Sequence, residues 1–167
     1  MERRALGGAN TIILSGLVNN REFGALLTHE CGHVVDIGSL TGNPRTGETD
    51  FYDGTEPIFA DDPSVSFYSI SWQTAVKKKA RATGSDFVSG YAMSDIFEDF
   101  AEHFAYYALH NEDFLRLAQK NKVLMQKYQW MKNNVFKGTP VIASGQYERT
   151  AATPPWDVTK LPYQWLQ

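Results

Sequence analysis

The stretch His29-Glu30-Cys31-Gly32-His33 contains the residue types that could do metal chemistry. On a helix, side chains at positions i and i+4 lie on the same face, so the imidazoles of His29 and His33 could bind one zinc ion together. Glu30 lies between them and could take a proton from a water molecule on that ion. The spacing therefore predicts zinc-dependent hydrolysis, although two partly exposed histidines on an ordinary helix would give the same pattern.

A zinc site of this kind needs a third protein ligand, and the fourth position is left to water. The metzincin pattern places a glycine three residues after the second histidine and another histidine three residues further on. Those two positions hold Asp36 and Ser39, which excludes that class. The chain has four histidines, so His103 and His110 remain candidate ligands elsewhere in the sequence.

A carboxylate on a later helix is another common source of the third ligand. Glu98 and Glu102 are spaced at i and i+4, so both side chains share one helix face, with Phe97, Phe100 and Phe104 beside them. One carboxylate could bind zinc, while the other could accept the N–H of a zinc-binding histidine and fix its tautomer. The same pair could also form the acidic face of an ordinary solvated helix.

The segment 91–104 resembles the zinc-site helix of the anthrax lethal factor-like metallopeptidases. These enzymes are gluzincins, a group that also includes the bacterial Pro-Pro endopeptidases, and their pattern is a tyrosine, a gap and then E-x-F-A-E-x-F. The matching residues are Tyr91 and Glu98-Asp99-Phe100-Ala101-Glu102-His103-Phe104. The resemblance implies that Glu98 is the third zinc ligand, that Glu102 supports a zinc-binding histidine, and that Tyr91 helps to stabilise the oxyanion.

Together these residues predict a zinc-dependent endopeptidase that acts on protein or peptide substrates. In this hypothesis Zn²⁺ is bound by His29, His33 and Glu98. Glu30 is the general base, which takes the proton of the attacking water and delivers it to the leaving amine. Tyr91 donates a hydrogen bond to the tetrahedral oxyanion.

Three alternatives stay open. Asp50, in the segment 47–54, loosely matches the loop that carries the third ligand in aspzincins, although a Gly/Asp turn explains that segment better. The chain could also be a zinc-binding module without turnover, which would need neither Glu30 nor Tyr91. Finally, it could be a helical interaction domain in which the H-E-x-x-H spacing is accidental, and metal content would separate that case from the others.

The hydrophobic pattern predicts the elements that position the motif. A β-branched run at residues 10–15 predicts a strand, whose edge could pair with an extended peptide. Asn19 or Asn20 could cap a helix that contains both histidines and runs to about Ile37, with Gly38 as its stop. The motif then lies inside a helix, as the chemistry requires.

The next segments are less regular. Residues 40–66 are rich in Gly, Pro, Thr and Asp, which predicts a long loop. Residues 67–83 predict a helix with Ser71 near its start, in which the run Lys77-Lys78-Lys79 forms a solvated face rather than a nucleic-acid patch.

The second half of the chain is predicted to be helical before its tail. Ser94 is the predicted N-cap of the helix that carries the two glutamates and ends near His110. Apolar spacing over residues 111–134 predicts a further helix or a helix pair. The proline-rich tail, about 138–167, is expected to be mostly irregular and to pack on the domain through Trp156 and Trp165.

Length and composition fit one globular domain over residues 1–167, since the 167 residues are 43% hydrophobic and 21% charged. The predicted fold class is α+β and mainly helical: a zincin-like domain with a small sheet beside the active-site helix and a helical C-terminal part. No zinc is expected to be needed for folding, because a chain of this length can bury its own core.

Charge and cysteine content limit the partners. The formal charge of −3 favours neither nucleic acid nor an anionic membrane, and no apolar run reaches the ~20 residues of a membrane span. Cys31 is the single cysteine, so no intrachain disulfide can form. We expect a monomer; the family resemblance points to a secreted or cell-surface location, although the chain shows no signal peptide.

Overall fold

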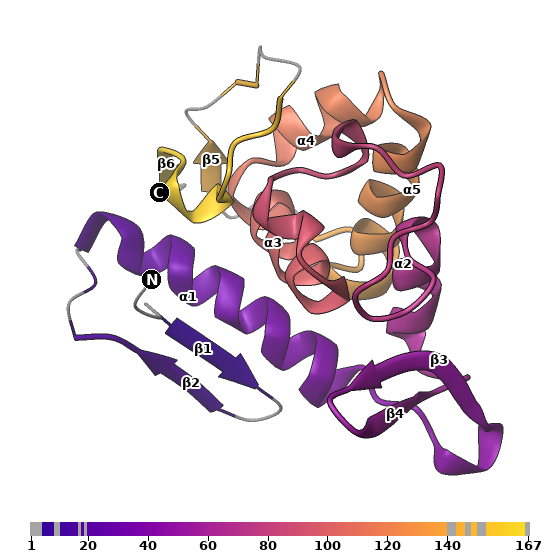
Figure 1. Ribbon diagram of the computed structural model, residues 1–167. Helices are drawn as coiled ribbons and strands as arrows, with labels where there is room; N and C mark the ends of the chain where they lie inside the picture. The colour runs from indigo at the N-terminus through magenta and orange to yellow at the C-terminus, as the bar shows by residue number, and fades with distance from the viewer. Residues whose placement is uncertain are drawn as a thin grey trace.

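The computed structural model describes residues 5–8, 11–16, 18, 20–139, 143–145, 148–149 and 153–165. Asn10, Asn19 and the side chain of Trp165 lie outside these residues. The described fold is mainly helical with small two-stranded antiparallel sheets, which agrees with the predicted α+β class (Figure 1). Among the described helices, none is long and apolar enough to span a bilayer.

An N-terminal hairpin lies beside the helix that carries the histidines. Strands β1 (Ala5–Gly8) and β2 (Thr11–Leu14) pair antiparallel, and Figure 1 shows them along one side of α1 (Asn20–His33). β2 matches the predicted strand, and the small sheet lies where it was expected. β1 was not predicted because its sequence, Ala-Leu-Gly-Gly, has no β-branched residue.

Helix α1 continues into a π-helical turn at Val34–Ser39. The N–H of Leu40 donates to the carbonyl of Val35 at 2.9 Å, an i+5 to i bond that widens the helix. The helical run therefore passes Ile37, and the predicted stop at Gly38 is wrong. Gly38 is not among the residues with positive φ, the conformation by which a glycine ends a helix.

The predicted long loop at 40–66 contains an unexpected hairpin. Strand β3 (Glu48–Asp53) pairs antiparallel with β4 (Glu56–Phe59), and Gly54 makes the turn between them with a φ of 60°, which favours glycine. Only Phe51 is buried on β3, so the strand lacks the alternating pattern that would have predicted it.

Helix α2 spans Pro63–Ser71, so the predicted helix at 67–83 is wrong in position. The Asp62 side chain accepts the amide N–H of Ser64 at 2.8 Å and caps the helix, and the proline that follows the cap fits the first helical position. The helix ends before Trp72, and the lysine run beyond it is not helical. An Asp-Pro start signal was missed.

The remaining predicted helices are confirmed with small shifts. Helix α3 spans Ile96–Leu109, and its N-cap is Asp95 rather than Ser94. The predicted helix pair is α4 (Asn111–Ala118) followed by α5 (Lys122–Trp130), which continues into a further π-helical turn. In Figure 1, α2, α4 and α5 lie on the side of α3 away from α1.

Helices α1 and α3 approach each other closely at Gly32. A Cβ atom at this position would lie 2.9 Å from the Cα of Ala101, closer than such atoms normally come. Glycine inside the motif therefore allows the histidine face of α1 to meet the glutamate face of α3.

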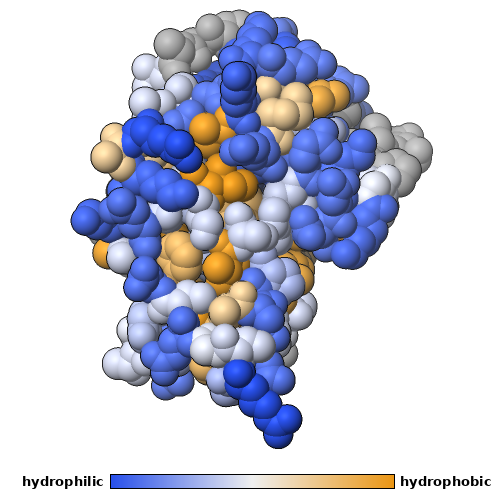
Figure 2. All heavy atoms as spheres, turned by 90° about the vertical axis from the view of Figure 1, so that its right-hand side faces the viewer, coloured by the Kyte–Doolittle hydropathy of each residue, from blue (hydrophilic) through white to orange (hydrophobic). Residues whose placement is uncertain are grey.

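The tail packs back on the body of the domain. Strand β5 (Ala143–Gly145) pairs antiparallel with β6 (Tyr163–Trp165), and Val158 between them is fully buried. Trp156 packs on Gly90 and Tyr91 as expected but stays 65% exposed, so Val158 is the residue of this segment that reaches the core. On the face of the molecule in Figure 2, polar side chains cover most of the surface and apolar ones gather near its middle.

Candidate metal centre

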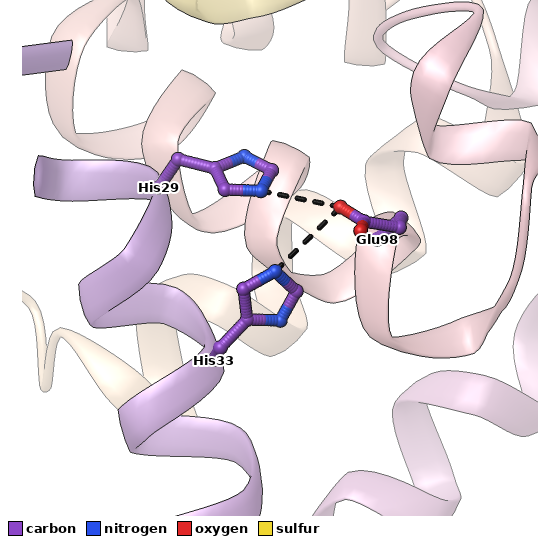
Figure 3. A group of neighbouring side chains, drawn as sticks. All are labelled: His29, His33 and Glu98. Atoms are coloured by element: carbon purple, nitrogen blue, oxygen red, sulfur yellow. Dashed lines mark ion pairs between the residues drawn. The ribbon is translucent and has the colours of Figure 1, made fainter. Parts of the chain in front are cut away.

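The two histidines of the motif project from one face of α1. His29 and His33 are 4% and 8% exposed, and their ring centroids lie 5.0 Å apart with the planes nearly perpendicular. Figure 3 shows both rings turned toward the same point on α3. The i, i+4 spacing in the sequence therefore places two imidazole nitrogens in one partly enclosed space, as the helix geometry predicts.

The first turn of α3 presents Glu98 to this space. The side chain of Asp95 accepts the amide N–H of Glu98 at 2.9 Å, which fixes the start of the helix. The Oε2 atom of Glu98 lies 3.2 Å from His29 Nε2 and 3.6 Å from His33 Nε2 (Figure 3). Residues from two elements far apart in the sequence thus meet at one carboxylate oxygen.

These three side chains fit a zinc ion. At Zn–N and Zn–O distances of about 2.1 Å, the ligand atoms of a tetrahedral site are separated by about 3.4 Å, close to the two distances seen here. Glu98 Oε2 is buried and makes no hydrogen bond among the described residues. His29, His33 and Glu98 are also the one group of His, Cys, Asp or Glu side chains in the described chain that could hold a metal ion.

Glu102 orients His29 from behind. Its Oε1 lies 2.9 Å from His29 Nδ1, while its Oε2 accepts the amide N–H of Val158 at 3.0 Å. The side chain of Glu102 is fully buried. In a neutral His29, a proton on Nδ1 that is donated to Glu102 would leave the Nε2 lone pair free to bind a metal ion.

Tyr91 closes another side of the space. Its hydroxyl donates to Glu98 Oε1 at 2.8 Å, and its ring stacks on His29 with centroids 6.0 Å apart. The backbone carbonyl of Trp156 accepts the Tyr91 N–H at 2.7 Å, and the two rings lie 6.3 Å apart. The C-terminal tail therefore helps to hold Tyr91 in place beside the histidines.

The charges at the site shift the pKa values strongly. Burial alone would lower the pKa of His29, but its close contacts with the carboxylates of Glu102 and Glu98 outweigh burial and raise the pKa to about 10. Burial would raise the pKa of Glu98, but the two histidines hold it well below its usual range. The pKa of Tyr91 is raised by burial and by the charge of Glu98, so its hydroxyl stays protonated.

Glu30, the candidate general base, follows His29 on α1 and is 5% exposed.

The rival candidates for the third metal ligand lie elsewhere in the structure. Asp50 is exposed on β3, and neither it nor His103 or His110 joins the metal-binding group among the described residues. His103 is instead paired with Asp99 inside the core.

Sequence reasoning missed the tail's contribution to this site. The Val158 N–H on Glu102 and the Trp156 carbonyl on the backbone of Tyr91 are main-chain contacts. They depend on where the tail lies and not on residue type, so no sequence motif signals them. The two prolines before Trp156 marked an irregular segment but gave no information about its contacts.

Comparison with known proteins gave one match. A family model whose description reads "Putative zinc-binding metallo-peptidase" matches residues 21–166. This span contains α1 from its second residue, the whole of α3 and the tail contacts described above. No curated protein and no solved structure matched the chain.

Proposed function

The chain belongs to this family of zinc-binding metallopeptidases, and we propose that it is a zinc-dependent endopeptidase of the gluzincin type, with residues 1–167 as one zincin-like catalytic domain. The observation that supports the subtype is the convergence of two Nε2 atoms from α1 and one carboxylate oxygen from α3 (Figure 3). Protein or peptide chains are the substrate class of such an enzyme.

His29, His33 and Glu98 are assigned as the zinc ligands, with the fourth position left to water. Bound zinc supplies two effects: it lowers the pKa of a water molecule and it polarises the scissile carbonyl. Glu102 holds His29 in the tautomer that a metal requires, through the contact at Nδ1. An unpartnered carboxylate oxygen between two imidazoles supports this assignment.

Glu30 is assigned as the general base. Glu30 directly follows His29 on α1 and is buried, and a buried glutamate inside the histidine motif supports this role. It accepts the proton of the attacking water and passes that proton to the leaving amine. A glutamine at this position would keep the shape of the side chain but could not accept the proton.

Tyr91 is assigned as the donor to the oxyanion. In the structure its hydroxyl donates to Glu98, so it directly contacts a proposed zinc ligand. When substrate is bound, the hydroxyl turns from Glu98 to the oxyanion of the tetrahedral intermediate. Its raised pKa keeps the proton available for that hydrogen bond.

The hairpin of β1 and β2 is the assigned platform for an extended substrate. The two strands pair only with each other among the described residues, so each keeps an unpaired edge. The hairpin lies along α1, the helix that carries the histidines (Figure 1). Main-chain hydrogen bonds to such an edge would hold a peptide in an extended form across the zinc.

The direct test is peptide cleavage by the zinc-loaded protein, read by mass spectrometry of a peptide library, with Glu30→Gln beside the wild type. We expect the wild type to cut, and the variant to lose turnover by about 10²–10⁴-fold while keeping its zinc. Near-normal hydrolysis by Glu30→Gln would contradict the proposed mechanism. A wild type that binds zinc but cuts nothing would favour a zinc-binding module without turnover.

A further inference from the structure

A cavity of about 280 Å³ lies at the end of the histidine helix. Its walls come from the π-helical turn after α1, from the β3–β4 hairpin, from the start of α2 and from the first turn of α3. At about 30 Å³ per water molecule, this space could hold one long side chain in place of several waters. Nothing in the metal chemistry described above uses it.

The cavity is strongly acidic. Four carboxylate residues line it and no lysine, arginine or histidine does; the four are Asp36, Asp53, Glu56 and Asp62. None of them forms an ion pair with another described residue. The lining therefore gathers acidic groups without a basic side chain of the described protein beside them.

Asp36, in the π-helical turn, is the most buried of the four. It is 2% exposed, and its Oδ1 accepts the hydroxyl of Tyr68 at 2.7 Å. Its Oδ2 is buried and makes no hydrogen bond of good geometry among the described residues, although the Ser64 hydroxyl lies near enough to lower the pKa of the Asp36 carboxyl group. Leaving a buried carboxylate oxygen unpaired costs free energy, so a donor from outside the chain would stabilise it. Burial raises the pKa of Asp36 to about 8, so the carboxyl group keeps its proton near neutral pH until a cation binds beside it and favours the charged form.

The residues that line the cavity favour an organic cation over a metal ion. The four carboxylates do not come close enough together to form a metal-binding group in the described structure. Between them lie apolar surfaces, among them Ile37, Ile58 and Phe97. A cationic head group on a hydrocarbon stem matches this combination, because the stem can pack on apolar walls while the head meets carboxylates.

The cavity adjoins the metal centre on two elements. Asp36 lies three residues after His33 on one continuous helical run, a separation of less than one turn. Phe97, which lines the cavity, directly precedes Glu98 on α3. A substrate whose backbone crosses the metal centre would therefore have a neighbouring side chain within reach of the cavity.

We propose that this cavity is a specificity pocket that binds the side chain of a lysine or arginine residue next to the scissile bond. The inference rests on the proposed function, because it assumes that a peptide lies across the metal centre. Asp36 receives the cationic head at the bottom of the pocket, and Asp53 and Glu56 on the β3–β4 hairpin attract it at the rim. The pocket makes this a peptidase that selects basic residues.

Binding can be tested without any hydrolysis. Nα-acetyl-lysine amide and Nα-acetyl-norleucine amide share the four-carbon stem, and only the first carries an ammonium group. We would titrate each into the zinc-loaded protein and follow the amide signals of cavity residues by NMR. We expect the lysine probe to bind there at least about tenfold more tightly. Equal binding of the two probes, or no change at the cavity signals, would overturn the proposal.

Variants on the exposed β3–β4 hairpin test whether the preference for the lysine probe depends on the cavity, and they leave the core unchanged. The double variant Asp53→Asn/Glu56→Gln removes two rim charges, and both residues are exposed, so folding should be unaffected. Asp50→Asn is the matched control, because Asp50 is exposed on the same hairpin but does not line the cavity. We expect the double variant to lose most of the lysine preference and the control to keep it. An equal loss in both would overturn the proposal.

Cleavage of matched peptides separates this inference from the proposed function. Peptide pairs that differ only by lysine or norleucine on either side of the scissile bond are incubated with the zinc-loaded wild type. A lysine preference that the double variant loses supports the pocket. Cleavage of both peptides at equal rates would overturn the proposed specificity pocket but would still support the proposed peptidase activity. If no peptide is cut, the proposed function fails, and the NMR titration still decides whether the cavity binds the cation.

Discussion

Helix α3 carries two carboxylate–histidine groups on different faces, and they balance their charges in opposite ways. Toward α1, Glu98 meets His29 and His33 around an oxygen with no hydrogen bond. Toward the core, Asp99 is bound by Lys127, whose Nζ lies 2.7 and 2.9 Å from its two oxygens. In the first group the positive charge comes from a histidine that can lose its proton, whereas in the second it comes from a lysine.

The difference also shows in the histidines. Burial alone would lower the pKa of His29, but its contacts with two glutamates raise it to about 10, so His29 itself carries the positive charge in the metal-free protein. Burial and the charge of Lys127 lower the pKa of His103, which is paired with Asp99. Similar residue types thus stabilise the fold where a lysine supplies the positive charge, and make up the proposed metal site where a titratable histidine supplies it.

The largest effect is expected from removing the internal cation. Lys127 is fully buried, so Lys127→Met would leave the Asp99 carboxylate without its partner and lower the free energy of unfolding by about 3–5 kcal/mol. Urea denaturation of the zinc-free protein measures this. Lys122→Met, at an exposed position on the same helix, should change stability by less than about 0.5 kcal/mol. If Lys127→Met is as stable as wild type, the two groups do not differ as described.

Zinc affinity should depend on pH. At pH values below its pKa of about 10, His29 keeps its proton in the metal-free protein, and zinc must displace that proton. Raising the pH favours the neutral imidazole, so affinity should rise about tenfold per pH unit, or about a hundredfold from about pH 6.5 to about pH 8.5. Competition with a chelator of known affinity measures this change. A flat or falling affinity would contradict the role of His29.

A smaller effect on zinc affinity is expected from Glu102, which contacts His29 on the side of the ring away from Glu98. Glu102→Gln keeps an acceptor for the Val158 N–H but removes the charge that faces His29 Nδ1. Zinc affinity should fall by about 10–100-fold, because the support of the imidazole weakens. The same chelator competition checks it, with Glu112→Gln at an exposed position as the control. Unchanged affinity in Glu102→Gln would show that Glu102 is only a packing residue.

The sequence predicted the parts of this molecule that depend on helical spacing. H-E-x-x-H and the two glutamates each lie at i and i+4, so the residues that share a face were known before their helices were placed. The helix pair after His110 followed from its apolar period in the same way. That α1 and α3 meet was implied only by the resemblance to a known zinc-site helix.

The features that the sequence did not predict depend on local turn chemistry and on tertiary contacts. The β3–β4 hairpin was missed because only one of its β3 residues is buried, and α2 was misplaced because Asp62-Pro63 was not recognised as its start. The ion pair of Asp99 and Lys127 joins two helices, and no spacing along the chain predicts it. The same holds for the burial of Asp36, which comes from Tyr68 and the elements around it.

The most direct test of the account is the zinc content of the purified, zinc-reconstituted protein by elemental analysis. Glu98→Gln and Asp50→Asn are compared with the wild type, because these two residues are the rival third ligands. The account predicts about one zinc ion per chain in the wild type and in Asp50→Asn, and a large loss in Glu98→Gln. Zinc retained in Glu98→Gln and lost in Asp50→Asn would contradict it, and so would a wild type that holds no zinc.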